Sequence, residues 1–151
     1  MSETTKPIGG LRSSARLAAV QALYQIEASG DKNIMVVKEF VDHRLGQVID
    51  DQQFSNADAD FFSDIVIGID KRSDEIDQYI SDSLSENWTL SRIDSVARAT
   101  LRAGTYEIIA RPDVPTSVII NEYVDVTKAF FEDSTPGFVN GVLDRIAKKV
   151  R

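Results

Sequence analysis

Apolar residues recur at steps of three and four along most of the chain, which is the spacing of one buried helix face. The first stripe starts at Leu11 and stops at Ser29-Gly30-Asp31, where Gly30 is expected to take the left-handed position that closes a helix. No segment alternates apolar and polar residues for long enough to predict a strand. The stripes predict an all-α fold of about seven helices, over residues 11–29, 33–48, 56–69, 73–84, 91–110, 116–131 and 135–150.

Several helix starts carry capping signals. Ser73 is expected to cap the fourth helix, and Ser91 with Asp94 has the spacing of a capping box at the start of the fifth. Thr135-Pro136 is typical of a cap followed by proline in the first turn. These signals place the boundaries of the later helices.

Two local features need an interpretation. The sequence Val-Asn-Gly-Val at 139–142 resembles a hairpin turn, but its apolar flanks keep the helical step, which favours a helix with Gly141 allowing a close backbone approach. Trp88 lies in a predicted loop and is expected to plug the core. Residues 1–10 are polar and are expected to form a flexible arm before a domain over 11–151.

The composition excludes several classes of protein. The chain has 151 residues, of which 42% are hydrophobic, so it is long enough to bury a core without a disulfide or a metal. It has no cysteine and one histidine, His43, which excludes structural zinc and thiolate catalysis. No stretch approaches the roughly 18 apolar residues of a membrane span. We expect a cytoplasmic protein without a membrane partner.

The net charge of −7 is unevenly distributed. Residues 50–82 hold ten acidic and two basic side chains, which gives this segment −8 and leaves +1 for the rest of the chain. A solvated face is the favoured interpretation, and a docking surface for a basic protein is the alternative. Because binding uses local fields, the global acidity is weak evidence against a nucleic-acid partner.

The residues offer little support for an enzyme. Asp58, Asp60 and Asp64 can share a helix turn and hold a hard cation, but they lack the spacing of a calcium loop, and acidic residues are common at helix starts. His43 is interpreted as a surface residue on the polar side of its helix. We predict no catalytic residue, no metal and no cofactor.

The basic residues are more informative. Arg12 and Arg16 are four apart and therefore share a helix face, while the chain ends in a basic helix. Arginine binds phosphate in a bidentate way and stacks on bases, although solvated helix surface explains any single residue equally well. Tyr24 and Phe138 are candidate base platforms, but both lie beside apolar stripes, where core packing is the stronger interpretation.

Four strings resemble the NusB transcription antitermination family. They are VQALY at 20–24, ARATLRAGTYE at 97–107, the VP, INE and KAF segments between 114 and 130, and FVNGVLD at 138–144. The resemblance covers residues 11–147 in the family's order, and it is weakest over 30–75. It implies an all-helical fold of two small packed bundles. It also implies no reaction and no cofactor.

The resemblance further implies a function. Members of the family bind the boxA element of nascent ribosomal RNA together with NusE, a small-subunit ribosomal protein, and act with other Nus factors on the elongating RNA polymerase. Carried over by position, the residues expected to bind RNA are Lys6, Arg12, Arg16, Tyr24, Lys128 and Phe138. Those expected to bind NusE are Asp94, Arg98 and Glu122.

The chain departs from the family pattern in two places. Ser13 and Ser14 stand where relatives often have more arginines, and Ser83 stands where some have an aromatic residue. The logarithm of the RNA-binding constant falls with the logarithm of the salt concentration, and each missing phosphate contact makes that slope shallower by about 0.7. We therefore expect weak RNA binding by the isolated protein, with NusE supplying much of the affinity.

Two alternatives remain open at this point. One is a NusB-like module that serves a separate ribosomal RNA methyltransferase, because the chain itself has no glycine-rich cofactor segment. The other is a helical adaptor that binds protein through the acidic segment. The oligomeric state is also open, with a monomer expected in the active complex and a homodimer as the other state.

Overall fold

The computed structural model describes residues 11–45, 48–49, 52–53 and 56–151. The expected arm over 1–10, including Lys6, lies outside the described residues. Within them the chain forms seven α-helices, which confirms the all-α prediction. Their bounds are α1 (Leu11–Ser29), α2 (Asn33–Phe40), α3 (Asn56–Lys71), α4 (Ser73–Asp82), α5 (Ser95–Ala110), α6 (Thr116–Phe130) and α7 (Thr135–Val150).

The chain divides into two compact units, Met1–Ile67 and Gly68–Arg151, and the division falls inside α3. In the first unit, α1 buries four alanines on one face, and these small side chains allow its neighbours to approach closely. Phe40 of α2 and Phe62 of α3 stack with 5.3 Å between ring centres. These contacts form the core of the first unit.

The segment after α2 differs from the predicted continuous helix. α2 ends at Phe40 and continues as a π-helical turn over Val41–Leu45. Two short strands follow, β1 (Val48–Ile49) and β2 (Gln52–Gln53), paired antiparallel with Val48 opposite Gln53. The apolar residues from Val41 to Val48 therefore extend past the end of α2. A few apolar positions fit a short strand as well as a helix, so the pattern did not show where the helix ends.

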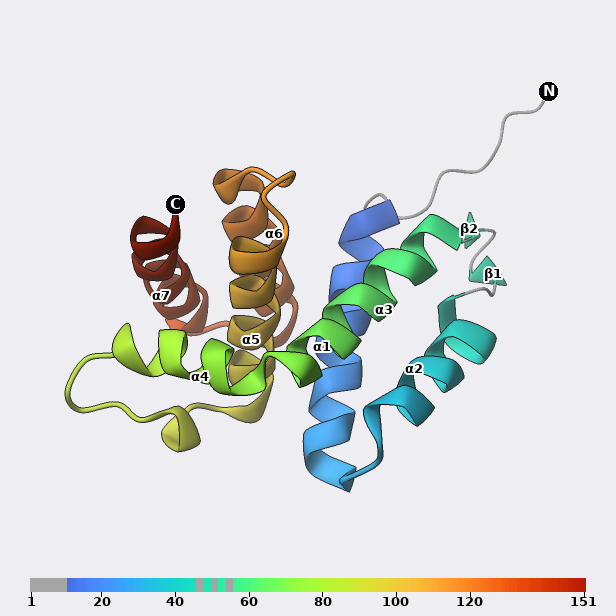
Figure 1. Cartoon of the computed structure of the whole chain (residues 1–151), viewed down its shortest axis with the longest axis horizontal. Helices are drawn as coiled ribbons and strands as arrows, with labels where there is room; N and C mark the ends of the chain where they lie inside the picture. Colours follow the sequence, from blue (N-terminus) through green and yellow to red (C-terminus); the bar gives the residue numbers. More distant parts are fainter. Residues whose placement is uncertain (1–10, 46–47, 50–51, 54–55) are drawn as a thin grey trace. The chain divides into compact units, whose positions relative to one another are not determined.

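In the second unit, α5, α6 and α7 pack against one another, and α4 crosses them and contacts α5 (Figure 1). Their shared core contains Leu101, Ile119, Tyr123, Leu143 and Ile146, all fully buried. Inside this core the hydroxyl of Tyr123 donates a hydrogen bond to Oε2 of Glu107 at 2.5 Å. This bond satisfies a buried carboxylate that belongs to α5.

The helix ends show which capping signals were interpreted correctly. Gly30 has φ of 75° and closes α1 as predicted. Ser73 is the first helical residue of α4 and does not cap it, and Ser91 lies in a separate 3₁₀ turn over Leu90–Arg92. Asp94 itself caps α5, because its Oδ1 accepts hydrogen bonds from the main-chain N–H groups of the next turn. The capping-box interpretation of Ser91 was therefore wrong by one turn.

Helix α7 confirms that Val-Asn-Gly-Val at 139–142 is helical. Proline lies in its first turn, as expected, but Thr135 is the first helical residue and the residue at the cap position, Ser134, makes no side-chain cap bond. Oδ1 of Asp133 accepts from the N–H of Thr135 at 2.9 Å. The expected close approach at Gly141 is wrong, since a Cβ there would meet Arg145 at an ordinary 3.6 Å. Close approaches lie instead at Gly68, where a Cβ would meet the ring of Tyr106, and at Gly104, where it would lie 2.9 Å from both methyl carbons of Leu143.

Candidate nucleic-acid interface

Arg12 and Arg16 lie on one face of α1, and both place their guanidinium groups over the ring of Phe61 in α3. The distances from the guanidinium carbons to the ring centre are 4.5 Å for Arg12 and 5.0 Å for Arg16. The shared face is therefore confirmed. However, Arg12 is exposed while Arg16, which was also expected to meet an RNA phosphate, is only 3% exposed. A guanidinium over an aromatic face is held more strongly when it is desolvated.

Tyr24 lies on α1 in the same unit as the two arginines. Its side chain is 45% exposed, so the core packing that its sequence position favoured is wrong. An exposed tyrosine on a helix face has a free ring surface on which a base can stack.

Lys128 and Phe138 belong to the second unit. Lys128 lies exposed in the last turn of α6, with Nζ 3.9 Å from Oδ1 of Asp125, and Phe138 lies half-buried in the first turn of α7. Four residues separate the end of α6 from the start of α7, which places both at the α6–α7 turn. The structure therefore groups the predicted RNA residues as Arg12, Arg16 and Tyr24 in one unit and Lys128 and Phe138 in the other.

Phe138 contacts Trp88, which the sequence interpretation had placed in the core. Their ring centres are 5.7 Å apart and the ring planes are tilted by 45°. Trp88 is 44% exposed, so the prediction that it plugs the core is wrong. The signal for its exposure was its setting among the polar residues of the loop between α4 and α5, from Ser85 to Thr89.

The residues predicted to bind a protein partner lie on α5 and α6. Asp94 is exposed, and its Oδ1 accepts from the N–H groups of Val96 and Ala97 at 2.8 and 3.3 Å. Arg98 donates from Nη1 to the carbonyl oxygens of Leu90 and Ile93 at 3.2 and 2.6 Å. These bonds build the start of α5. Glu122 lies half-buried on α6.

Some acidic side chains of residues 50–82 form ion pairs with arginines inside the second unit. Arg102 of α5 makes a bidentate ion pair with Asp77 of α4, at 2.9 and 3.1 Å. Arg72 donates to both carboxylate oxygens of Glu75, and this hydrogen bonding lowers the pKa of Glu75 below its usual value. The segment is therefore partly a set of internal pairs, and Arg102 is not a free cation for RNA.

The described part of the chain contains no group of three histidine, cysteine or acidic side chains arranged to hold a metal. The side chain of Asp58 lies outside the described residues, so the possible cation site of Asp58, Asp60 and Asp64, which the sequence did not favour, stays untested. No helix in the described ranges is long and apolar enough to cross a membrane. His43 is exposed, which confirms its interpretation as a surface residue.

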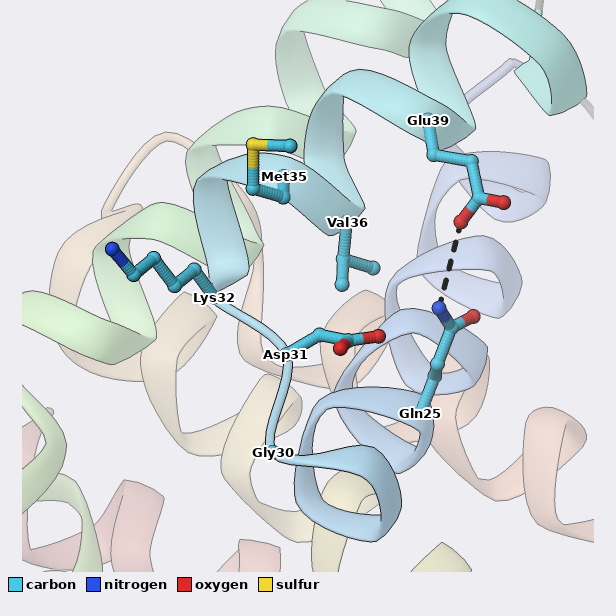
Figure 2. Close-up of a pocket in the computed structure, with 7 residues that line it drawn as sticks. All are labelled: Gln25, Gly30, Asp31, Lys32, Met35, Val36 and Glu39. Atoms are coloured by element: carbon cyan, nitrogen blue, oxygen red, sulfur yellow. Dashed lines mark hydrogen bonds between the residues drawn. The ribbon is translucent and has the colours of Figure 1, made fainter.

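A hollow of about 550 Å³ lies between the end of α1, the turn after it and the start of α2 (Figure 2). On its walls the side-chain amide of Gln25 donates to Glu39 at 3.5 Å, and Asp31 and Lys32 add charges of opposite sign. None of the residues predicted to bind RNA or protein lines this hollow. Its mixed charge distinguishes it from a phosphate-binding surface.

A model of the NusB family matches residues 13–148. The chain belongs to the NusB family. Relatives in the family include the transcription antitermination protein NusB of Sinorhizobium fredii, which is 52% identical over 140 residues, or 93% of this chain and 88% of that protein. The NusB of Sphingopyxis alaskensis is also 52% identical, over 93% of this chain and 94% of that protein.

Solved NusB structures share the fold. A structure of T. maritima NusB superposes with a TM-score of 0.79 and 32% identity, covering 91% of both chains. A crystal structure of the antitermination factors NusB and NusE in complex with double-stranded RNA gives a TM-score of 0.77 at 26% identity, over 92% of this chain and 97% of that one. The NusB resemblance of the four strings is therefore confirmed, and so is the fold it implied.

Proposed function

We propose that the protein is a transcription antitermination factor that binds boxA RNA of nascent ribosomal RNA transcripts together with NusE. The observation that carries the proposal is the match, over nearly the whole chain, to a NusB fold solved with NusE and RNA. The curated relatives at 52% identity are named for antitermination. The proposal assigns no reaction and no cofactor to the chain.

On the RNA side, Arg12, Tyr24, Lys128 and Phe138 are the proposed contacts. Arg12 and Lys128 are exposed cations, Tyr24 is exposed, and Phe138 keeps part of its ring accessible. Lys6 joins this set by its position in the sequence. Arg16 has a different proposed role, since its buried guanidinium holds the Phe61 ring beside Arg12. Phosphate contacts fix the position of the RNA, and aromatic faces bind its bases.

On the protein side, Asp94 and Glu122 are the proposed contacts to NusE, with Arg98 holding the turn that presents Asp94. A net charge of −7 favours association with a basic protein and speeds the encounter. We propose that the monomer enters this complex and that the complex acts with other Nus factors on the RNA polymerase elongation complex in the cytoplasm.

A titration of labelled boxA RNA, with and without NusE and at two salt concentrations, tests the proposal. We expect weak binding by the chain alone, tighter binding with NusE, and a preference for boxA over a scrambled sequence. Each phosphate contact should add about 0.7 to the logarithmic salt slope. Equal binding of boxA and scrambled RNA would contradict a specific antitermination role. Equal affinity with and without NusE would contradict the cooperative part.

A further inference from the structure

The loop between α4 and α5 is fastened along one stripe of α7. Phe138, Arg145 and Lys149 are spaced seven and four residues apart, so they share a helix face. Arg145 donates from Nε to the carbonyl oxygen of Ser83 at 2.8 Å, and Lys149 donates from Nζ to that of Asp82 at 3.2 Å. These bonds fix the start of the loop.

Further along, the same stripe fixes Trp88 through its contact with the Phe138 ring. The indole is 44% exposed although it is held on one side by an aromatic ring. Arg92 lies over it, with 5.7 Å from the guanidinium carbon to the ring centre, and donates from Nη1 to the carbonyl oxygen of Asn87 at 2.8 Å. An aromatic surface is therefore held in place and left partly open.

Arg92, Arg145 and Lys149 are exposed, and their hydrogen bonds go to neutral acceptors. The acceptors are main-chain carbonyl oxygens and, for Lys149 at 3.5 Å, the hydroxyl of Ser83 as well. Arg92, an exposed cation over a partly exposed indole, suits a ligand that carries both a flat ring and a phosphate. An unpaired nucleotide of RNA has both.

We propose that Trp88 is a base-stacking residue for the bound RNA, extending the platform of Phe138, and that Arg92 binds an adjoining phosphate. This inference rests on the proposed function and adds a residue to its RNA surface. It explains why a large aromatic side chain stays exposed at a fixed position, since stacking needs an open face that is already ordered before the base arrives.

Trp88 is the one tryptophan of the chain, so its fluorescence reports this position directly. Unlabelled boxA RNA is titrated into the full chain with NusE, after subtraction of a NusE blank, while the anisotropy of labelled RNA reports binding independently. We expect the emission to be quenched over the same concentration range as the anisotropy rises. Trp88→Ala should weaken RNA binding about 5- to 100-fold, and Trp88→Phe should recover most of it.

Ile34→Ala is the matched control, because Ile34 is 60% exposed on α2, and neither proposed surface includes a residue of that helix. It should bind RNA like the unchanged chain, and thermal melting of each variant separates lost contacts from lost folding. Normal RNA binding by Trp88→Ala, or unchanged emission while RNA binds, would overturn the stacking role and leave the proposed function standing. Lost NusE binding with RNA affinity intact would also overturn it and assign Trp88 to a protein contact. Failure of the unchanged chain to bind RNA would overturn both.

Discussion

The guanidinium carbon of Arg16 lies 5.0 Å from the ring centre of Phe61, and the arginine is almost fully buried there. Arg12 uses the same ring at 4.5 Å but remains exposed. Two arginines one helical turn apart thus differ in role: the inner one packs, and the outer one keeps its charge at the surface. The exposure of each side chain, and not its residue type, decides which of them can meet a phosphate.

Alanine substitutions should separate these two roles. Arg12→Ala should leave the melting temperature nearly unchanged and lower the logarithmic salt slope of RNA binding by about 0.7. Arg16→Ala removes a desolvated cation–aromatic contact and a buried stem, and should lower the free energy of unfolding by about 2 kcal/mol. Thermal melting and RNA titration of both variants check this. An unchanged melting temperature in Arg16→Ala would argue that its guanidinium serves RNA after all.

Gly104 of α5 packs where a side chain does not fit. A Cβ there would lie 2.9 Å from both methyl carbons of Leu143, whose side chain is fully buried in the core. Overpacking of about 1–3 kcal/mol should outweigh the roughly 1 kcal/mol gained in helix propensity, so Gly104→Ala should be destabilising in urea unfolding. In Gly137→Ala the new methyl meets nothing within 4 Å and should stabilise by about 0.5 kcal/mol. The same sign for both substitutions would refute this account of the packing.

Arg151 fastens the end of α7 to the turn between α5 and α6. Its guanidinium donates to the carbonyl oxygens of Val114 and Arg111 at 2.7 and 2.8 Å, and to that of Ile108 at 3.1 Å. Arg151→Ala should lower the free energy of unfolding by about 2 kcal/mol, because several charge-assisted bonds to helix-end carbonyls are lost together. Lys148→Ala removes an exposed pair with Asp144 and should cost less than about 0.5 kcal/mol. Comparable losses in both variants would show that general charge, and not this clamp, is responsible.

The helix periodicity of the sequence predicts the all-α fold, but it does not predict the segment after α2 or the residues that cap the helices. The apolar stripe of each helix indicates which residues face the core. The stripes predict seven helices, and the structure has seven α-helices over the described residues. The periodicity did not show that the helix starting at Asn33 gives way to a π-helical turn and a strand pair, because apolar residues continue from the helix through the turn and into β1. Caps were misplaced by one or more residues where Ser and Asp both lie near a helix start, as at Ser91 and Asp94.

The candidate site was predictable by residue type but not by exposure. The apolar periodicity placed Arg12 and Phe138 on their helices, while burial depends on contacts that are distant in sequence. Phe61 lies 45 residues after Arg16, and the contact between them cannot be inferred from either helix alone. Trp88 was misassigned although its polar loop setting indicated exposure, and its contact with Phe138, 50 residues later on α7, could not be inferred from the loop alone.

Asp133 gives the start of α7 a defined dependence on pH. Hydrogen bonds from the hydroxyl and the main-chain N–H of Thr135 lower the pKa of Asp133 below its usual value. A carboxyl with a depressed folded-state pKa stabilises the fold above its unfolded pKa of about 3.9, and that contribution disappears as the pH falls through the folded value. Asp133→Ala should therefore destabilise the protein in urea at pH 7 and have a smaller effect near pH 3.

Asp133→Asn is the control, because an amide oxygen accepts the same hydrogen bonds without titrating. Its effect relative to Asp133→Ala should change little with pH. Urea midpoints for the three proteins, followed in steps from pH 7 to pH 3, give the comparison. An equal loss of stability in Asp133→Ala at pH 7 and at pH 3 would show that the ionised carboxylate does not stabilise the start of α7. The stability of this helix start would then depend on Pro136 and the packing of Phe138 instead.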